Sequence, residues 1–325
     1  MGFNKSFYIK AEAEIKARKA ANNNIIISRQ KEISKKFPDY VSLREELAGT
    51  GGELISILGA QDVAAQIKKL SEKNLGIQAR IETLLLENGY PRDYLNPIHT
   101  CLKCKDSGIY EGIRCDCFLD IVKRFAANEL NQSSPIKLSS FDVFDLRLYP
   151  DEKDNETGRN IRKGMAGIFE YCKQFADDFH LPCNGILMRG NTGLGKTHLS
   201  LAIAGEVLKK GYSVIYGSAP DLFRRIEKEH FNSQIESDTL GLLQNTELLV
   251  LDDLGSEFDS QFYVSTLYNL LNFRMNRGLA VIVSTNLDLK SLQKRYNDRV
   301  VSRLLTLEGL DFFGRDIRIY NKILR

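Results

Sequence analysis

The chain has 325 residues, which is enough for one large hydrophobic core and a smaller second unit. Its net charge of +3 and its charged fraction of 27% neither require nor exclude a nucleic-acid partner. No apolar stretch approaches the roughly 20 residues that span a membrane, and the amino terminus lacks the apolar core of a secretion signal. We therefore expect a cytoplasmic protein with no membrane partner, whose six cysteines do not form structural disulfides.

Residues 1–98 are predicted to form a helical domain. The stretch Lys10–Lys36 is rich in Ala, Lys, Arg and Glu and carries a partial apolar stripe. Pro38 ends it and can begin a second helix, which carries Leu43, Leu47, Leu54, Ile55 and Leu58. A third helix is expected over about 78–87, where Asn88-Gly89-Tyr90-Pro91 stops it. A small helical bundle that docks a partner protein is our interpretation, and a solvated appendage without a partner is the alternative.

Residues 99–125 are predicted to form a small metal module. Cys101-x-x-Cys104 and Cys115-x-Cys117 are two short chelating pairs separated by ten residues. Four thiolates complete the tetrahedral shell of Zn²⁺ and leave no open position, so the site would be structural. His99 is a substitute ligand, and free thiols or a redox-active pair are the alternatives.

The rest of the chain is predicted to be a linker followed by an α/β domain. Asn131–Pro135 and the polar stretch Asp151–Arg159 are typical of exposed segments, which gives a linker over 126–159. From residue 160 a helix to about Phe179 precedes apolar strands that alternate with helices. The strands are expected at 185–188, 213–216, 248–251, 279–284 and 310–313. This alternation predicts a parallel sheet with helices on both faces.

A glycine-rich phosphate loop is the most specific motif of the chain. It follows the first of these strands, precedes a helix that opens with His198, and matches the pattern G-x-x-x-x-G-K-T. Backbone N–H groups of such a loop surround the β-phosphate at the positive end of the helix. The lysine reaches the β- and γ-phosphates and the threonine hydroxyl holds Mg²⁺. We therefore expect ATP or GTP to bind at Gly190, Asn191, Thr192, Gly193, Leu194, Gly195, Lys196 and Thr197, with His198 beside them.

Polar side chains follow two further strands and complete the predicted site. Asp252 and Asp253 end the apolar run that begins at Leu248, at the strand end where open α/β sheets keep their ligands. Asp252 is expected to hold Mg²⁺ through water, and Asp253 to polarise the attacking water unless it only caps the turn. Glu257 is a second candidate for that base. Asn286 ends the next strand and can bind the nucleophilic water.

These motifs resemble a known family when they are taken in order. G-N-T-G-L-G-K-T-H-L, L-L-V-L-D-D-L-G-S-E, S-T-N-L and D-R-V-V-S-R-L are similar to the AAA+ ATPases that load bacterial replicative helicases, the DnaC type. The resemblance covers about residues 185–325. The cysteine cluster followed by a linker resembles the amino-terminal part of the loaders of Gram-positive bacteria and their phages.

The resemblance implies roles for four arginines. Arg303 corresponds to the arginine finger that reaches the γ-phosphate of a neighbouring subunit, with Arg299 as a possible assistant and a surface ion pair as the alternative. Arg318 falls where loaders carry a second nucleotide-sensing arginine, and Arg315 is its competitor. Asp253 departs from the Glu that most AAA+ proteins have there. Too few residues follow Arg303 for a helical lid, as in the loaders, so residues 160–325 are expected to be a lidless AAA+ domain.

The resemblance also implies a DNA contact. The stretch from Ser218 to Lys228 reads as a helix, and in the loaders and related initiators this region lines a channel for single-stranded DNA. Phe223 could stack on a base, while Arg224, Arg225 and Lys228 could meet phosphates. A charged helix face with a core Phe223 is the alternative.

The predicted function is that of an ATP-dependent loader of the hexameric replicative helicase, the DnaB type, onto single-stranded DNA. The expected cofactors are ATP, Mg²⁺ and Zn²⁺, and the expected partners are the helicase, single-stranded DNA and further copies of the chain. A transposition helper ATPase is one alternative, although such proteins generally lack a cysteine cluster. A zinc-dependent nucleic-acid adaptor with a purely structural nucleotide site is another.

Overall fold

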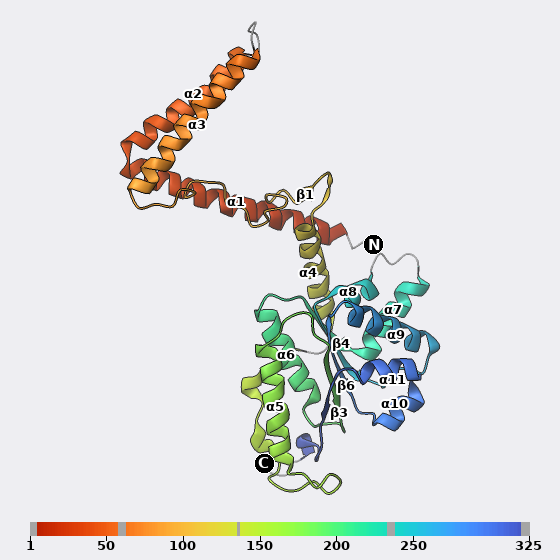
Figure 1. Ribbon diagram of the computed structural model, residues 1–325. Helices are drawn as coiled ribbons and strands as arrows, with labels where there is room; N and C mark the ends of the chain where they lie inside the picture. Colours follow the sequence, from red (N-terminus) through yellow and green to blue (C-terminus); the bar gives the residue numbers. More distant parts are fainter. Residues whose placement is uncertain (1–4, 58–62, 135–136, 233–237, 320–325) are drawn as a thin grey trace. The chain divides into compact units, whose positions relative to one another are not determined.

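The computed structural model describes residues 5–57, 63–134, 137–232 and 238–319 (Figure 1). The chain forms two compact units. One is Ala11–Leu119, and the other is Asp120–Arg325 together with the first ten residues. In the described part of the chain, no helix is long and apolar enough to cross a membrane.

The first unit is built mainly from three helices: α1 (Lys5–Lys36), α2 (Pro38–Ile57) and α3 (Val63–Glu87), of which α2 and α3 pack side by side. Ile33, Tyr40 and Leu85 form a small buried cluster where the three helices meet. The sequence prediction began α3 fifteen residues too late, since only Leu70 and Ile77 are buried among its first fifteen residues. Leu58 of the predicted second helix lies outside the described residues.

The cysteine segment contains little regular structure. Strands β1 (Ile109–Tyr110) and β2 (Ile113–Arg114) form a minimal antiparallel hairpin, and helix α4 (Asp116–Ser133) follows at once. The first residues of the linker predicted over 126–159 are therefore helical, because α4 continues to Ser133. Asn131 is buried because its amide donates to the Val214 carbonyl and accepts from the Tyr216 N–H.

The second unit contains a five-stranded parallel sheet with helices on both faces, as the sequence predicted (Figure 1). The strand order is β4-β5-β6-β3-β7, so β6 lies between β5 and β3. Four of the strands are mostly apolar and buried, which is typical of parallel sheets covered on both sides, whereas the edge strand β7 is mostly exposed. Their bounds are β3 (Gly185–Arg189), β4 (Val214–Ser218), β5 (Leu248–Leu254), β6 (Ala280–Thr285) and β7 (Glu308–Asp311).

Helices α5 (Ile161–Asp177) and α6 (Lys196–Lys209) share a hydrophobic cluster with one face of the sheet. The predicted last strand is shifted by two residues, because Phe312 and Phe313 leave the sheet and Phe313 packs against Gly164 of α5. The remaining elements are η1 (Phe141–Val143), η2 (Leu146–Leu148), α7 (Ala219–Phe231), α8 (Thr239–Asn245), α9 (Gln261–Asn276), α10 (Leu289–Arg295) and α11 (Asp298–Leu304).

A buried arginine aligns the two strands that carry the acidic and amide residues of the predicted site. Arg274 of α9 donates to the carbonyls of Leu243 and Thr246, just before β5, at 2.6 and 2.8 Å. It also donates to the Ala280 carbonyl, the first of β6. Burial lowers the pKa of this guanidinium to about 9, and carbonyl oxygens take the place of water around it. The starts of β5 and β6 are thereby held together.

Candidate functional site

The phosphate loop adopts the backbone that its glycines permit. It connects β3 to α6, and Gly190, Gly193 and Gly195 all have positive φ, at 143°, 73° and 91°. A Cβ atom at Gly190 would lie 2.2 Å from the Phe312 carbonyl oxygen, so no other residue fits there. Helix α6 begins at Lys196, which leaves its first N–H groups free for an anion.

Lys196 is buried beside the loop. Its ammonium donates to the carbonyls of Gly190 and Asn191 at 2.6 and 2.7 Å, and to Asn286 Oδ1 at 2.8 Å. Burial lowers the pKa of Lys196 to about 8. The cation is therefore held by neutral oxygens, which phosphate oxygens can replace with stronger, charge-assisted bonds.

Thr197 and Asp252 meet from neighbouring elements. The Thr197 hydroxyl lies 2.9 Å from both carboxylate oxygens of Asp252, and the Ser284 hydroxyl also donates to Asp252. Burial raises the pKa of Asp252 above its usual range. A hydroxyl and a carboxylate at this distance form the oxygen set that Mg²⁺ prefers, so these residues could hold the ion between them and the phosphates.

Asp253 lies one residue further, in a left-handed conformation with φ of 57°. Its N–H donates to Ser284 Oγ at 3.0 Å, and its carboxylate accepts the Asn286 amide at 2.8 Å. Asn286 therefore touches Lys196 through its oxygen and Asp253 through its nitrogen. The structure thus joins three predicted residues, from the start of α6, the end of β5 and the end of β6, in one continuous contact.

These residues open onto a cavity of about 560 Å³, a size within the usual range for small-molecule sites. His198 lines it and contacts Ser139 Oγ at 3.0 Å. Arg318 also lines it, because the Ile317 N–H donates to the Gly193 carbonyl at 3.1 Å and brings the carboxyl-terminal segment to the loop. The residues that line the cavity are Thr192, Gly193, Leu194, Gly195, Lys196, Thr197, His198, Asp252, Asp253, Ser284, Asn286, Ile317 and Arg318.

Four other predicted residues lie elsewhere. Glu257 is buried, and its carboxylate accepts the Gly255 N–H and the Tyr296 hydroxyl. Arg303 donates to Asn272 Oδ1 at 2.7 Å, and its guanidinium lies 4.2 Å from the centre of the Tyr268 ring. Arg299 contributes a backbone carbonyl to Arg303, and Arg315 lies 3.6 Å from Glu152.

Helix α7 carries the predicted DNA-binding residues. Phe223 is fully buried and stacks on Tyr263 with ring centroids 5.7 Å apart, so the structure supports its interpretation as a core residue and contradicts base stacking by this ring. Arg224 and Lys228 are exposed four residues apart and share one helix face. Arg225 is partly buried and lies 3.3 Å from Glu229.

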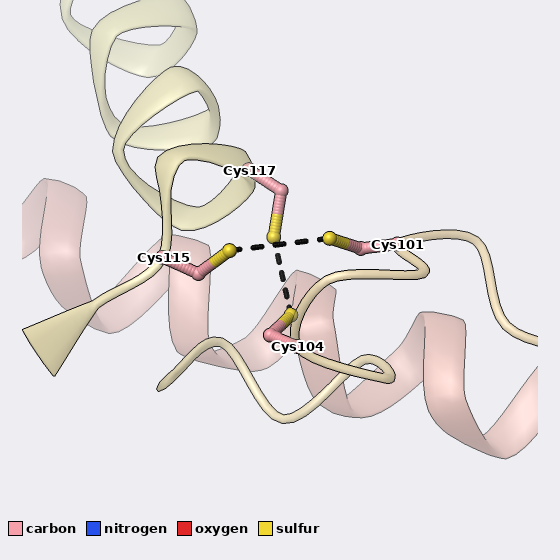
Figure 2. A group of neighbouring side chains, drawn as sticks. All are labelled: Cys101, Cys104, Cys115 and Cys117. Carbon is pink, nitrogen blue, oxygen red and sulfur yellow. Dashed lines mark hydrogen bonds between the residues drawn. The ribbon is translucent and has the colours of Figure 1, made fainter. Parts of the chain in front are cut away.

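The four predicted cysteine ligands come together. Figure 2 shows their sulfur atoms pointing toward one another, and all four lie within 4.8 Å. The Cys101–Cys115 and Cys104–Cys117 sulfurs are 3.9 and 3.5 Å apart. Tetrahedral Zn²⁺ with bonds of about 2.3 Å places sulfurs about 3.8 Å apart, so the cluster fits this ion.

The surroundings of the four thiols allow one of them to lose its proton more readily than an ordinary cysteine. Burial raises the pKa of Cys104, but the Gly108 N–H and the neighbouring thiols outweigh it and bring the pKa to about 7. Burial and the neighbouring thiols raise the pKa of Cys117. His99, the predicted substitute ligand, lies 4.0 Å from Asp106 instead of beside the sulfurs.

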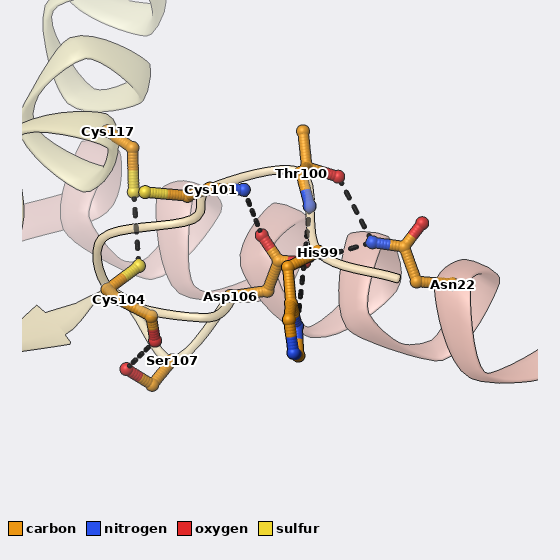
Figure 3. A network of polar contacts seen from close by, with 8 residues as sticks. All are labelled: Asn22, His99, Thr100, Cys101, Cys104, Asp106, Ser107 and Cys117. Atoms are coloured by element: carbon orange, nitrogen blue, oxygen red, sulfur yellow. Dashed lines mark hydrogen bonds and ion pairs between the residues drawn. The ribbon is translucent and has the colours of Figure 1, made fainter. Parts of the chain in front are cut away.

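Sequence reasoning missed residues that support both sites. Ser284 begins the S-T-N-L motif, yet the contacts of its hydroxyl with Asp252 and Asp253 depend on strand register. Tyr149, within the predicted linker, donates to the Leu194 carbonyl at 3.0 Å and fixes the phosphate loop. Asp106 accepts hydrogen bonds beside the cysteines (Figure 3). No spacing rule identifies any of these residues.

The sheet order, the phosphate loop after β3 and the acidic end of β5 define an AAA+ P-loop nucleotide-binding domain. Residues 176–310 match the sequence model of the family described as IstB-like ATP binding protein, so this part of the chain is similar to that family.

Curated relatives align with the same region. The replicative helicase loader DnaC of Escherichia coli strain K12 is 25% identical over 143 residues, which cover 44% of this chain and 58% of that protein. The DnaC protein of Buchnera aphidicola subsp. Baizongia pistaciae is 27% identical over 145 residues, with 44% and 58% covered. An uncharacterised Escherichia coli protein, YdaV, is 26% identical over 147 residues, with 45% and 59% covered. The chain thus spans less than two thirds of the length of these relatives.

Solved structures also match part of this chain. A structure titled as the DnaI protein covers 55% of this chain and 90% of its own, at 24% identity and a TM-score of 0.44. A structure of the DnaC helicase loader covers 54% of this chain and 97% of its own, at 24% identity and a TM-score of 0.44.

Lys196 gives nucleotide binding a dependence on pH. Burial lowers the pKa of the free ammonium to about 8, whereas phosphate oxygens stabilise the charged form and raise it. Binding above that pH must therefore take up a proton, and the affinity should fall by up to about tenfold per pH unit as the pH rises above about 8. Calorimetric titration at about pH 9 in two buffers of different ionisation enthalpy measures the proton uptake.

Lys196→Arg is the matched control, because a guanidinium stays charged throughout this range and should bind without proton uptake. Wild-type binding that releases the same heat in both buffers would contradict the assignment.

Proposed function

We propose that this protein is an ATP-dependent loader of the hexameric replicative helicase, and that it delivers the helicase to single-stranded DNA. The main support is the continuous contact of Lys196, Asn286 and Asp253 beside the phosphate loop. The helicase assignment draws on relatives of the same domain that are named replicative helicase loaders.

In this proposal ATP lies in the cavity with its phosphates at the loop. Lys196 exchanges its neutral oxygen partners for the β- and γ-phosphates. Thr197 and Asp252 orient Mg²⁺, which neutralises charge on the phosphates, and Arg318 approaches from the carboxyl-terminal segment. Every residue of this set lines the same cavity.

Asp253 is the proposed base for the attacking water. It lines the cavity and accepts the Asn286 amide, so the carboxylate and the amide could hold one water together. Glu257 has other partners, because Tyr296 donates to it and Arg295 lies 3.5 Å away. We therefore assign the base to Asp253 and a structural role to Glu257.

Arg303 is proposed to complete the site of a neighbouring subunit. Within its own chain it lies over Tyr268 and donates to Asn272, which holds the guanidinium at the surface of α9 and α11. These partners are neutral, so among the described contacts of Arg303 no carboxylate competes with a phosphate for the cation. The chain would then assemble through its ATPase domain and hydrolyse ATP at shared interfaces.

The other proposed roles belong to the remaining segments. The four-cysteine cluster holds structural Zn²⁺, residues 1–98 bind the helicase, and the segment 126–159, which begins within α4, connects them to the ATPase domain of residues 160–325. Arg224 and Lys228 provide a cationic face for DNA phosphates, since both are exposed on one side of α7. Arg225 is a weaker candidate because it is partly buried and lies 3.3 Å from Glu229, whereas exposed Arg224 lies 3.7 Å from Asp221.

A transposition helper ATPase is the second candidate, because the matching family is described by the name IstB. The cysteine cluster favours the loader, as transposition helpers generally lack one. A nucleic-acid adaptor with a structural nucleotide site is the third, and it predicts no ATP turnover.

The helicase assignment predicts a direct, ATP-controlled effect on helicase loading. The purified protein should bind the hexameric replicative helicase of its own organism and increase the amount bound to closed circular single-stranded DNA. Lys196→Ala should still bind the helicase but should not load it, because the variant lacks the ammonium that binds the phosphates. Gel filtration and nuclease protection measure the two steps. A protein that neither binds the helicase nor loads it, but stimulates a transposase, would support the second candidate.

The assignment of the base predicts different outcomes at two acidic residues. Asp253→Asn should bind ATP normally and lose about 10²–10⁴ in turnover, because an amide cannot accept the proton of water. Glu257→Gln is the matched control and should keep turnover within a few-fold. Steady-state phosphate release, with binding measured by a fluorescent nucleotide, separates the two effects. The reverse order of defects would assign the base to Glu257.

The shared site predicts rescue by mixing. Arg303→Ala should bind ATP through its intact Lys196 but lose roughly 10³–10⁵ in rate, as trans-acting fingers do. Mixing it with Lys196→Ala should restore part of the activity, because some interfaces regain both an intact loop and an intact finger. A self-contained monomer would show no recovery at any ratio, and a normal rate for Arg303→Ala alone would reduce the residue to a surface charge.

A further inference from the structure

Helix α1 contains a segment that its own sequence does not favour. Three consecutive asparagines, Asn22 to Asn24, lie in the middle of this 32-residue helix. Asparagine is a poor helix former because its side chain competes for backbone hydrogen bonds. Exposed Ile25 and Ile27 follow, so little apolar burial compensates there. The helix therefore needs an external contact at this point.

Asp106 provides that contact. Its carboxylate is buried, and Oδ2 accepts the Asn22 amide at 2.9 Å and the Thr100 N–H at 2.8 Å. Oδ1 accepts the Cys101 N–H at 2.9 Å. Figure 3 shows the carboxylate between helix α1 and the loop that enters the cysteine cluster. One side chain thus fixes both the first cysteine ligand and the middle of α1.

The loop around Asp106 cannot hold this geometry by local preference alone. Lys105 and Asp106 are consecutive left-handed residues, with φ of 50° and 58°. Such a turn persists when its surroundings fix it, and here Cys104 precedes it by one residue. A metal ion bound by the four sulfurs would fix the loop from Cys101 to Cys104, and with it the position of the carboxylate.

Two more contacts lie along the same helix. Glu12 pairs with Arg114 at 2.7 Å, and Ile15 packs beside Gly108. Both are near the amino-terminal end of α1, and Arg114 is exposed on the minimal hairpin. Asn22 is therefore the point where the cysteine segment reaches furthest along the helix.

We propose that Asp106 is a positioning residue through which metal bound at the four cysteines orders helix α1 around Asn22. This inference rests on the proposed zinc site. Metal binding fixes the 101–106 loop, the loop presents Asp106 to Asn22, and the helix gains the contact that its sequence lacks. By linkage the same contact strengthens metal binding.

Hydrogen exchange of the full-length protein tests the coupling. With zinc bound, amides of about residues 18–26 should be protected, and removal of zinc by a chelator should raise their exchange at least about tenfold. Asn22→Ala should exchange there as fast with zinc as without it. Asn23→Ala is the matched control, because Asn23 is an exposed neighbour and the change in helix propensity is the same.

The two variants distinguish the proposed coupling between metal and helix from a local effect of alanine on helix stability. Alanine favours helix, so a residue with only a local role would make Asn22→Ala more protected than wild type, as Asn23→Ala should be. The proposal requires the opposite result for Asn22→Ala alone. Equal behaviour of the two variants, or unchanged exchange after zinc removal, would overturn it.

Metal affinity supplies a second readout. Asp106→Asn replaces one acceptor oxygen by a donor and should weaken zinc binding about 10- to 100-fold in competition with a chromophoric chelator, as loss of outer-shell partners does. Asp106→Glu, which keeps the acceptors, should recover part of that loss. Metal analysis of the wild-type protein should find one zinc per chain. A chain without zinc would contradict the zinc site itself, whereas a zinc-loaded chain with normal affinity in Asp106→Asn would contradict only the link.

Discussion

The nucleotide site depends on the position of β6 between β3 and β5. Thr285, the last residue of β6, pairs with Arg189 at the end of β3 and with Leu254 at the end of β5. The next residue, Asn286, is therefore placed between the phosphate loop and the acidic turn. Because a parallel sheet brings its carboxyl ends to one edge, Lys196 and Asn286 meet there although they lie 90 positions apart in the sequence. Arg274 supports this arrangement from the opposite edge, where it joins the starts of β5 and β6.

The same contact relates nucleotide binding to the acidic side of the site. The Lys196 ammonium donates a hydrogen bond to the amide oxygen of Asn286, and the amide nitrogen of Asn286 donates to the Asp253 carboxylate. Phosphate oxygens bind an ammonium more strongly than neutral carbonyls do, so a nucleotide would draw Lys196 away from Asn286. The amide oxygen would then be free to accept from a water beside Asp253. Nucleotide binding at the loop and positioning of the attacking water would therefore result from the same exchange of hydrogen bonds.

The sequence predicted the features that follow from local pattern. The phosphate loop, the five strands and the cysteine pairs each depend on residue type and spacing, and the structure brings their members together. The failures depend on tertiary contacts. Phe223 is part of the core because Tyr263 of α9 covers it, and Asn131 of α4 is buried because its side-chain amide bonds to the backbone of β4. The partners of Glu257 come from α10 and the residue after it, which no spacing in the sequence relates to this loop.

The fold of the cysteine segment depends more on its four thiols than on its two short strands. Ile109 and Ile113, the apolar residues of the two-residue strands, are 49% and 69% exposed, so the hairpin buries little of its own surface. A segment of this size cannot offset its loss of conformational entropy by burial alone. Metal binding to four thiolates contributes on the order of 10 kcal/mol, which exceeds what such a hairpin could gain from packing. The fold of this segment, and the contact that Asp106 makes with α1, would then depend on the ion rather than on a hydrophobic core.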